Sequence, residues 1–277
     1  MKYCDLHCHS TYSDGTLTPA ELIRLAEEKG LGALALTDHN SGRGLPEFMA
    51  AGRDSSVIPV PGCEFTTEYK GRELHIVGLF FAEETWPEIE DYVELMHIAK
   101  HNSNLRLMEK LQQGGYDVYY EEAAALTDAE EFNRAHVARL LAAKGYVATV
   151  SEAFETILRE GGGFYVPPRR LGSLGTIRFI RQYGAVPVFA HPFLNMNERE
   201  LEEFLPLARE AGLMAMETHY TEFDAETTRK AEELARRFGL KQSGGSDFHG
   251  ATKPNIALGS GRGDLEVPFS FYESLKP

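Results

Sequence analysis

The sequence predicts an α/β fold built as a barrel, because short apolar runs alternate with helical patterns along the chain and seven such units can be recognised. Strands that alternate with helices favour parallel pairing, and a series of this length favours a barrel over an open sheet. The predicted strands are residues 3–9, 33–37, 57–60, 74–81, 186–190, 213–216 and 241–245.

Helices are predicted between these strands. Thr18-Pro19-Ala20-Glu21 has the pattern of a helix start, with an N-cap Thr, Pro at the first position and Glu closing a capping box, and this helix should end near Gly30. Further helical patterns cover 171–183, 198–211 and 225–238. Residues 101–165 do not follow the strand–helix rhythm, so we expect an inserted helical subdomain there, within a barrel made of 1–100 and 166–277.

Composition narrows the class of protein. The 277 residues include 28 basic and 42 acidic side chains, a net charge of −14, so stable binding to long nucleic acid is not expected. No segment approaches the roughly 20 apolar residues of a membrane helix. The start of the chain is too polar for a signal peptide. Three cysteines, Cys4, Cys8 and Cys63, do not suggest a disulfide framework, and we expect a cytoplasmic protein.

Histidines and carboxylates follow the predicted strands. His7 and His9 are two residues apart on one strand, so both side chains face the same way, while Cys8 between them should point into the core. Strand ends share one face of a parallel barrel, so these groups should converge. His75 is the exception, because it lies early in its strand. The candidate metal ligands are His7, His9, Asp14, His39, Glu64, His75, His191, Asp247 and His249.

Several of these residues lie in motifs that resemble those of the PHP (polymerase and histidinol phosphatase) superfamily of metal-dependent phosphoesterases. The matching segments occur in the family's order along nearly the whole chain. They are Asp5-Leu6-His7-Cys8-His9-Ser10 with Asp14-Gly15, Thr37-Asp38-His39-Asn40, Gly62-Cys63-Glu64, Leu74-His75-Ile76-Val77-Gly78, Ala190-His191-Pro192 and Gly244-Gly245-Ser246-Asp247-Phe248-His249.

The resemblance implies a distorted (β/α)7 TIM-like barrel with a trinuclear site for Mn, Fe or Zn. It implies three groups of ligands, with Glu64 bridging two metals. The groups are His7, His9, Glu64 and Asp247; Glu64, His75 and His191; and Asp14, His39 and His249. Imidazole and carboxylate ligands suit these transition metals better than Mg or Ca.

Within the superfamily the chain looks like the nucleoside 3′,5′-bisphosphate phosphatases and the 5′-3′ exoribonucleases. Asn133-Arg134-Ala135-His136-Val137-Ala138-Arg139 is similar to a stretch that implies phosphate binding by Arg134 and His136. The chain departs from these relatives at Phe132-Asn133, where they more often have Ile-Thr. The segment could instead be an ordinary helix face.

We therefore predict a hydrolase of phosphoric esters that acts on a phosphomonoester of a small nucleotide. Our hypothesis for the mechanism is in-line attack by a hydroxide held between two or three divalent cations, with no serine or cysteine nucleophile. The alternatives are an exoribonuclease that trims short RNA ends, a histidinol phosphatase, amide hydrolysis as in other metal-barrel enzymes, and a non-catalytic metal-binding scaffold. We expect no membrane partner.

Overall fold

The computed structural model describes residues 2–127, 132–159, 161–168 and 170–277. The chain divides into two compact units: unit 1 comprises Met1–Asp91 with Leu171–Pro277, and unit 2 comprises Tyr92–Arg170. Among the described residues, every helix is too short or too polar to cross a bilayer. The segment predicted as an insertion, 101–165, falls within unit 2, and its function as a substrate-binding subdomain stays a prediction.

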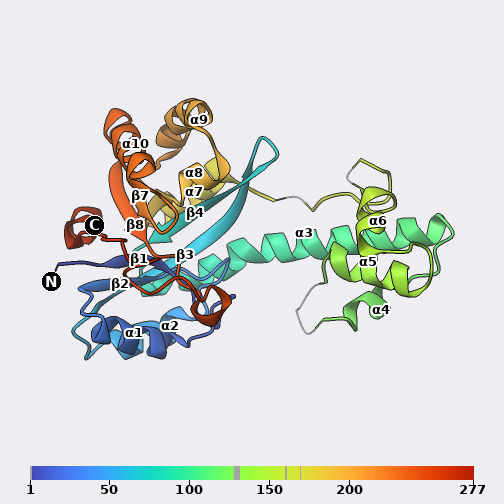
Figure 1. Ribbon diagram of the computed structural model, residues 1–277, viewed down its shortest axis with the longest axis horizontal. Coiled ribbons are helices and arrows are strands. Elements are labelled where there is room, and N and C mark those ends of the chain that lie inside the picture. Colours follow the sequence, from blue (N-terminus) through green and yellow to red (C-terminus); the bar gives the residue numbers. More distant parts are fainter. Residues whose placement is uncertain (1, 128–131, 160, 169) are drawn as a thin grey trace. The chain divides into compact units, whose positions relative to one another are not determined.

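A barrel-shaped sheet of seven strands forms the centre of unit 1 (Figure 1). An isolated parallel bridge between Cys8 and Phe248 joins the first strand to the residues after the last, so the sheet nearly closes. This confirms the predicted distorted barrel. In spatial order the strands are β1 (Asp5–Cys8), β2 (Ala33–Leu36), β3 (Ile58–Tyr69), β4 (Arg72–Leu79), β6 (Val186–Phe189), β7 (Ala215–Tyr220) and β8 (Lys241–Gly245), and the short β5 (Leu171–Gly172) pairs with β3.

The fourth strand corrects the expectation of parallel pairing throughout. β4 runs antiparallel to both β3 and β6. A two-residue turn joins it to β3, and both turn residues, Lys70 and Gly71, have positive φ (51° and 78°), as a tight hairpin of this kind requires. The predicted third strand, 57–60, was too short, because β3 continues past Glu64 to the hairpin turn.

The antiparallel direction explains the position of His75 in its strand. The first half of β4 lies beside the last half of β3, and the register pairs His75 with Thr66. The next residue, Ile76, pairs with Phe189 at the end of β6. An early residue of β4 therefore lies at the same end of the barrel as late residues of its parallel neighbours.

Helices cover the sheet, with α1 (Pro19–Glu28) and α2 (Leu45–Gly52) on one side of unit 1 and α9 (Glu198–Ala211) and α10 (Ala225–Arg237) on the other (Figure 1). The capping box predicted for α1 is present, since the Thr18 side chain accepts from the Glu21 backbone and the Glu21 side chain accepts from the Thr18 backbone. α7 (Ser173–Gln182) precedes β6, and α11 (Phe269–Leu275) ends the chain. The helices predicted at 171–183, 198–211 and 225–238 are thereby confirmed.

The barrel core is apolar, with buried residues from β1, β2, β3, β4, β6 and β7. The last strand contributes glycines instead. A Cβ on Gly245 would lie 2.3 Å from Cβ of His7 and 2.5 Å from its backbone nitrogen, so glycine permits β8 to approach β1 closely. All three cysteines are free and buried, and Cys8 donates to the Ala35 carbonyl at 3.2 Å, as expected of a core residue.

Unit 2 has its own apolar core, built by residues such as Leu111, Val137 and Leu158. Its helices are α4 (Tyr120–Ala124), α5 (Arg134–Ala143) and α6 (Val150–Glu155), together with most of α3 (Trp86–Gln113). Asn133 caps α5, because its side chain accepts from the backbone of Ala135 and His136.

Candidate metal centre

The buried carboxylate of Glu64 lies at the centre of a group of five histidines. Its Oε2 atom is 3.2 Å from His7 Nε2, 3.3 Å from His9 Nε2 and 3.0 Å from His39 Nδ1. Its Oε1 atom is 2.8 Å from His75 Nδ1 and 3.0 Å from His191 Nε2. Glu64 is 0% exposed, so the five rings shield this carboxylate completely from solvent.

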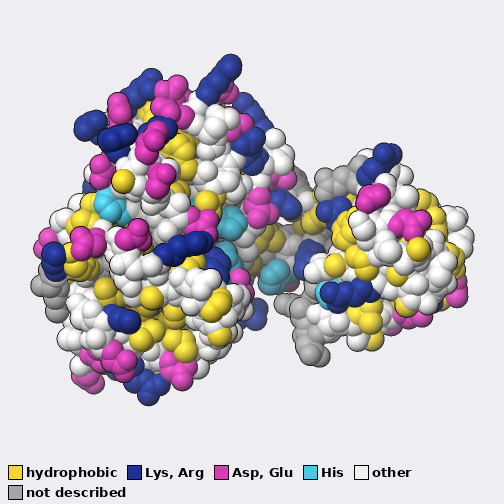
Figure 2. Space-filling view, in the orientation of Figure 1, with side chains coloured by type: hydrophobic (Ala, Val, Ile, Leu, Met, Phe, Trp, Pro, Cys, Tyr) yellow, Lys and Arg dark blue, Asp and Glu magenta, His cyan; other side chains and the backbone are white. Residues whose placement is uncertain are grey.

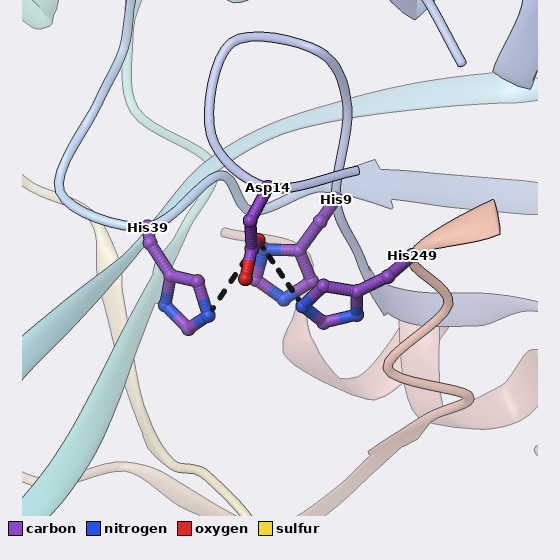
Figure 3. Close-up of side chains that lie close together, drawn as sticks. All are labelled: His9, Asp14, His39 and His249. Carbon is purple, nitrogen blue, oxygen red and sulfur yellow. Dashed lines mark ion pairs between the residues drawn. The ribbon is translucent and has the colours of Figure 1, made fainter. Parts of the chain in front are cut away.

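Asp14 forms the centre of a second group at the outer edge of the site (Figure 3). Its Oδ1 atom is 3.2 Å from His249 Nε2 and 4.0 Å from both His39 Nε2 and His9 Nδ1. Asp14 comes from the loop after β1, His39 from the loop after β2, and His249 from the segment after β8. Three loops that are distant in sequence thus place one carboxylate among three imidazoles.

Asp247 connects these groups and has two different environments for its two oxygens. Oδ1 faces the histidines, at 3.1 Å from His9 Nε2 and 3.5 Å from His249 Nδ1. Oδ2 accepts hydrogen bonds from the Tyr220 hydroxyl at 2.8 Å and from Lys253 Nζ at 2.7 Å. The carboxylate is therefore held on its outer side while its inner oxygen stays directed at the imidazoles.

Uncommon backbone conformations aim two of these side chains. His191 and Asp247 have positive φ, 30° and 55°, and Asn40, next to His39, has φ of 48°. A residue other than glycine in this region typically carries strain of about 1–3 kcal/mol, and such residues concentrate at functional sites. Here the turn occurs where the chain leaves a strand, so each side chain is directed toward the centre instead of continuing the alternation of the strand.

The hydrogen bonding of the site is incomplete in a way that fits metal ions. Among the described residues, buried atoms without a hydrogen-bond partner include His7 Nε2, both ring nitrogens of His9, His39 Nδ1 and Glu64 Oε2. Buried polar atoms without partners are rare and costly. Divalent cations would supply the missing interactions, because imidazole nitrogen and carboxylate oxygen are their usual ligands. The residues present thus fit the metals that the resemblance implies.

Electrostatics also favour cations. Burial by itself would raise the pKa of Glu64, but the imidazoles of His7, His75 and His39 lower it well below its usual value. Burial opposes protonation of His75, yet Glu64 beside it raises the pKa of that imidazole to about 10. Burial lowers the pKa of His9 to about 3. The centre thus combines an ionised carboxylate with a neutral imidazole, His9, which has one ring nitrogen with a lone pair available to a metal ion.

Three overlapping sets of side chains have ligand atoms within 4.8 Å of one another, namely His9, Asp14, His39 and His249; His7, His9 and Glu64; and His39, Glu64 and His75. Asp247 and His191 lie beside these sets. All nine predicted ligands therefore lie at one end of the barrel. Metal binding by these residues stays a prediction, and so does the assignment of ligands to each ion, since His9, His39 and Glu64 each belong to two sets.

Glu217 contacts the candidate ligands, and sequence reasoning did not include it in the site. It lies in β7, is 1% exposed, and accepts from His7 Nδ1 at 2.8 Å and from the His191 backbone at 2.6 Å. Such a carboxylate behind a ligating histidine fixes the orientation of the ring. A signal was available, because Glu217 follows a predicted strand as several candidate ligands do.

Two buried aspartates support the loops in a parallel manner. Asp5 accepts from the backbone and hydroxyl of Ser246 at 2.9 and 2.5 Å, which fixes the residue before Asp247. Asp38 accepts from the backbone and hydroxyl of Ser10 at 2.7 and 2.6 Å, which fixes the residue after His9. The aspartates of both sequence motifs thus hold loops in place beside the centre.

The two predicted phosphate-binding residues lie in unit 2. Arg134 is stacked on Tyr165, with its guanidinium carbon 4.1 Å from the ring centroid. His136 Nδ1 accepts from the Asn133 backbone at 3.1 Å and completes a capping box at the start of α5. Both therefore have structural roles within unit 2, and binding of substrate by them stays a prediction.

A barrel with histidines and carboxylates around a buried centre defines a metal-dependent hydrolase. The family model of the PHP domain matches residues 5–166. The 5′-3′ exoribonuclease of Haemophilus influenzae is 32% identical over 249 residues, which cover 90% of each chain. The 3′,5′-nucleoside bisphosphate phosphatase of Chromobacterium violaceum is 29% identical over 251 residues, 90% of this chain and 88% of the relative.

A solved structure from Bifidobacterium adolescentis has the same fold, with a TM-score of 0.68 and 24% identity over 98% of this chain and 94% of that one. The chain belongs to the PHP family and is a metal-dependent phosphoesterase. The resemblance found in the sequence motifs is thereby confirmed.

Proposed function

We propose that this enzyme hydrolyses a phosphomonoester of a small nucleotide, such as a nucleoside 3′,5′-bisphosphate. The observation that carries the proposal is the gathering of histidines around the buried Glu64 and beside the partly exposed Asp14 at one end of the barrel, a set of side chains that could hold two or three ions of Mn, Fe or Zn. When bound, such cations neutralise phosphate oxygens and lower the pKa of water toward about 7.

The chain's own residues would hold the ions and shape the site. Glu64 would help to hold two ions, which is supported by the different histidines that lie beside its two carboxylate oxygens. Glu217 accepts a hydrogen bond from His7 and so holds that ring in position. Tyr220 donates to Asp247 and holds that carboxylate in position. A cavity of about 280 Å³, lined by His39, His75, His191 and Asp247 among others, gives a phosphate group access to the centre.

The net charge of −14 favours a small substrate over a long RNA. On the face shown in Figure 2, and over the described residues, Lys and Arg side chains are interspersed with Asp and Glu and form no continuous basic stripe. A long RNA would need such a stripe. The relative from Haemophilus influenzae is nevertheless named an exoribonuclease, so trimming of short RNA from a 5′ end is the second candidate function. The three free, buried thiols suit a reducing compartment, and we propose the cytoplasm.

The test compares substrates at a fixed metal content. Protein stripped with chelator and reloaded with manganese should bind two to three equivalents and release phosphate from adenosine 3′,5′-bisphosphate. Hydrolysis of a short 5′-phosphorylated RNA tests the second candidate function, an exoribonuclease. Release of phosphate from histidinol phosphate tests a third, histidinol phosphatase. His249→Gln should lose activity, whereas His219→Gln, a matched change away from the centre, should not. Equal turnover by metal-free protein, or no hydrolysis of any ester after loading, would refute the proposal.

A further inference from the structure

Lys253 lines the cavity next to the candidate metal centre and differs in charge from the other residues of the lining. Lys253 follows the short helix η2 (Gly250–Thr252), and its side chain is 38% exposed. Of the described residues that line the cavity, it is the only Lys or Arg. The other charged residues of the lining, apart from histidines, are acidic: Glu64, Glu73, Glu222 and Asp247. A phosphate entering this cavity would meet one ammonium group of the protein.

Lys253 is not required to hold Asp247. Both Lys253 Nζ and the Tyr220 hydroxyl donate to Oδ2 of Asp247, at 2.7 and 2.8 Å. Tyr220 is 4% exposed and packs its ring 5.2 Å from that of His191, so its hydroxyl is fixed at this oxygen. One buried donor already satisfies Oδ2, and the second comes from a partly exposed side chain. This redundancy leaves the ammonium available for another partner.

The chemistry of the ammonium group suits a phosphoryl oxygen. It has three donors on a flexible stem, so it can keep its bond to Asp247 and direct another N–H into the cavity. Glu73 and Glu222 at the cavity wall would repel a phosphate dianion, but Arg262 already pairs with Glu222 at 2.9 Å. Lys253 is therefore the side chain of unit 1 that could offset the remaining repulsion on the side away from the histidines.

We propose that Lys253 binds the phosphoryl group of the substrate directly, as a catalytic residue, and that Tyr220 alone is sufficient to position Asp247. This inference rests on the proposed phosphoesterase function. It assigns to unit 1 a phosphate contact in addition to those predicted for Arg134 and His136. The contact between Lys253 and Asp247 is compatible with two roles for Lys253, which are positioning a metal ligand and binding substrate. The proposal assigns the second role to Lys253.

The experiment separates these roles by measuring metal content and phosphate affinity on the same samples. Lys253→Met, Lys253→Arg and the control Lys29→Met, an exposed lysine at the end of α1, are loaded with manganese. Metal equivalents are counted by elemental analysis, and the Kd for inorganic phosphate is measured by calorimetry. Steady-state kcat and KM with the bisphosphate substrate are measured alongside.

We expect Lys253→Met to keep its metal and to bind phosphate about 10- to 100-fold more weakly, the usual effect of losing one charged hydrogen bond. Lys253→Arg should recover most of the affinity, and Lys29→Met should match the wild type. An unchanged phosphate Kd in Lys253→Met would overturn the inference, and so would loss of metal, which would make Lys253 a positioning residue. Failure of the loaded wild type to bind phosphate or to hydrolyse any ester would instead remove the proposed function itself.

Discussion

Replacement of Glu217 tests the architecture of the metal centre without touching a predicted ligand. Its carboxylate accepts from His7 Nδ1 and from the His191 backbone, and it is 1% exposed. Glu217→Ala leaves both donors buried with no acceptor, and it also frees the His7 ring to rotate. Glu217→Gln keeps the shape of the side chain and one acceptor oxygen, so only one of the two bonds should be lost.

The magnitude follows from these two bonds. A hydrogen bond to a charged partner contributes about 1.5–3 kcal/mol, so Glu217→Ala should lower the free energy of unfolding of the metal-free protein by about 3–6 kcal/mol and Glu217→Gln by about half as much. Loss of the orienting carboxylate should also weaken metal binding by about 10- to 100-fold. The two effects have different causes and are measured separately.

Urea unfolding in the presence of chelator gives the first quantity, and competition with a fluorescent chelator gives the affinity for manganese. Glu232→Ala is the matched control, because this carboxylate of α10 is 42% exposed and lies outside the centre. If Glu217→Ala bound manganese within twofold of the wild type and lost less than about 0.5 kcal/mol of stability, typical of a surface change, the structural reasoning would be refuted.

Three further predictions concern packing, pH and charge. Gly245→Ala places a methyl group against the backbone of His7, so it should lower the free energy of unfolding by about 1–3 kcal/mol, measured by urea titration. An unchanged free energy of unfolding would show that β8 can move away from β1. Burial lowers the pKa of His219, so its contribution to stability is present at pH 7 and is lost as the pH falls below its unfolded value of about 6.5. The stability difference between wild type and His219→Gln should therefore shrink between pH 7 and pH 5, and a constant difference would contradict this. Glu64→Gln removes the charge shared by five imidazoles, so it should reduce bound manganese by at least one equivalent in elemental analysis; full loading would contradict the bridging position of Glu64.

The sequence was sufficient to locate most of the centre because ligand residues follow strands, and strand ends of a barrel meet at one face. His7, His9, His39, His191 and His249 could all be placed in this way from periodicity. His75 could not be explained so, because the pattern of apolar residues gives the position of a strand and not its direction. Only the pairing of β4 between β3 and β6 showed that an early residue of an antiparallel strand reaches the same face.

The order of strands and helices, the capping of α1, the core position of the cysteines and the set of candidate ligands were thus determined by the sequence alone, since each depends on local periodicity or residue type. The tertiary structure decided the hairpin between β3 and β4, the role of Glu217 behind His7, and the contact of Lys253 with Asp247. His7 and Glu217 are 210 positions apart in the sequence. The position of Glu217 behind His7 is settled by the geometry of the nearly closed sheet, on which local sequence patterns carry no information.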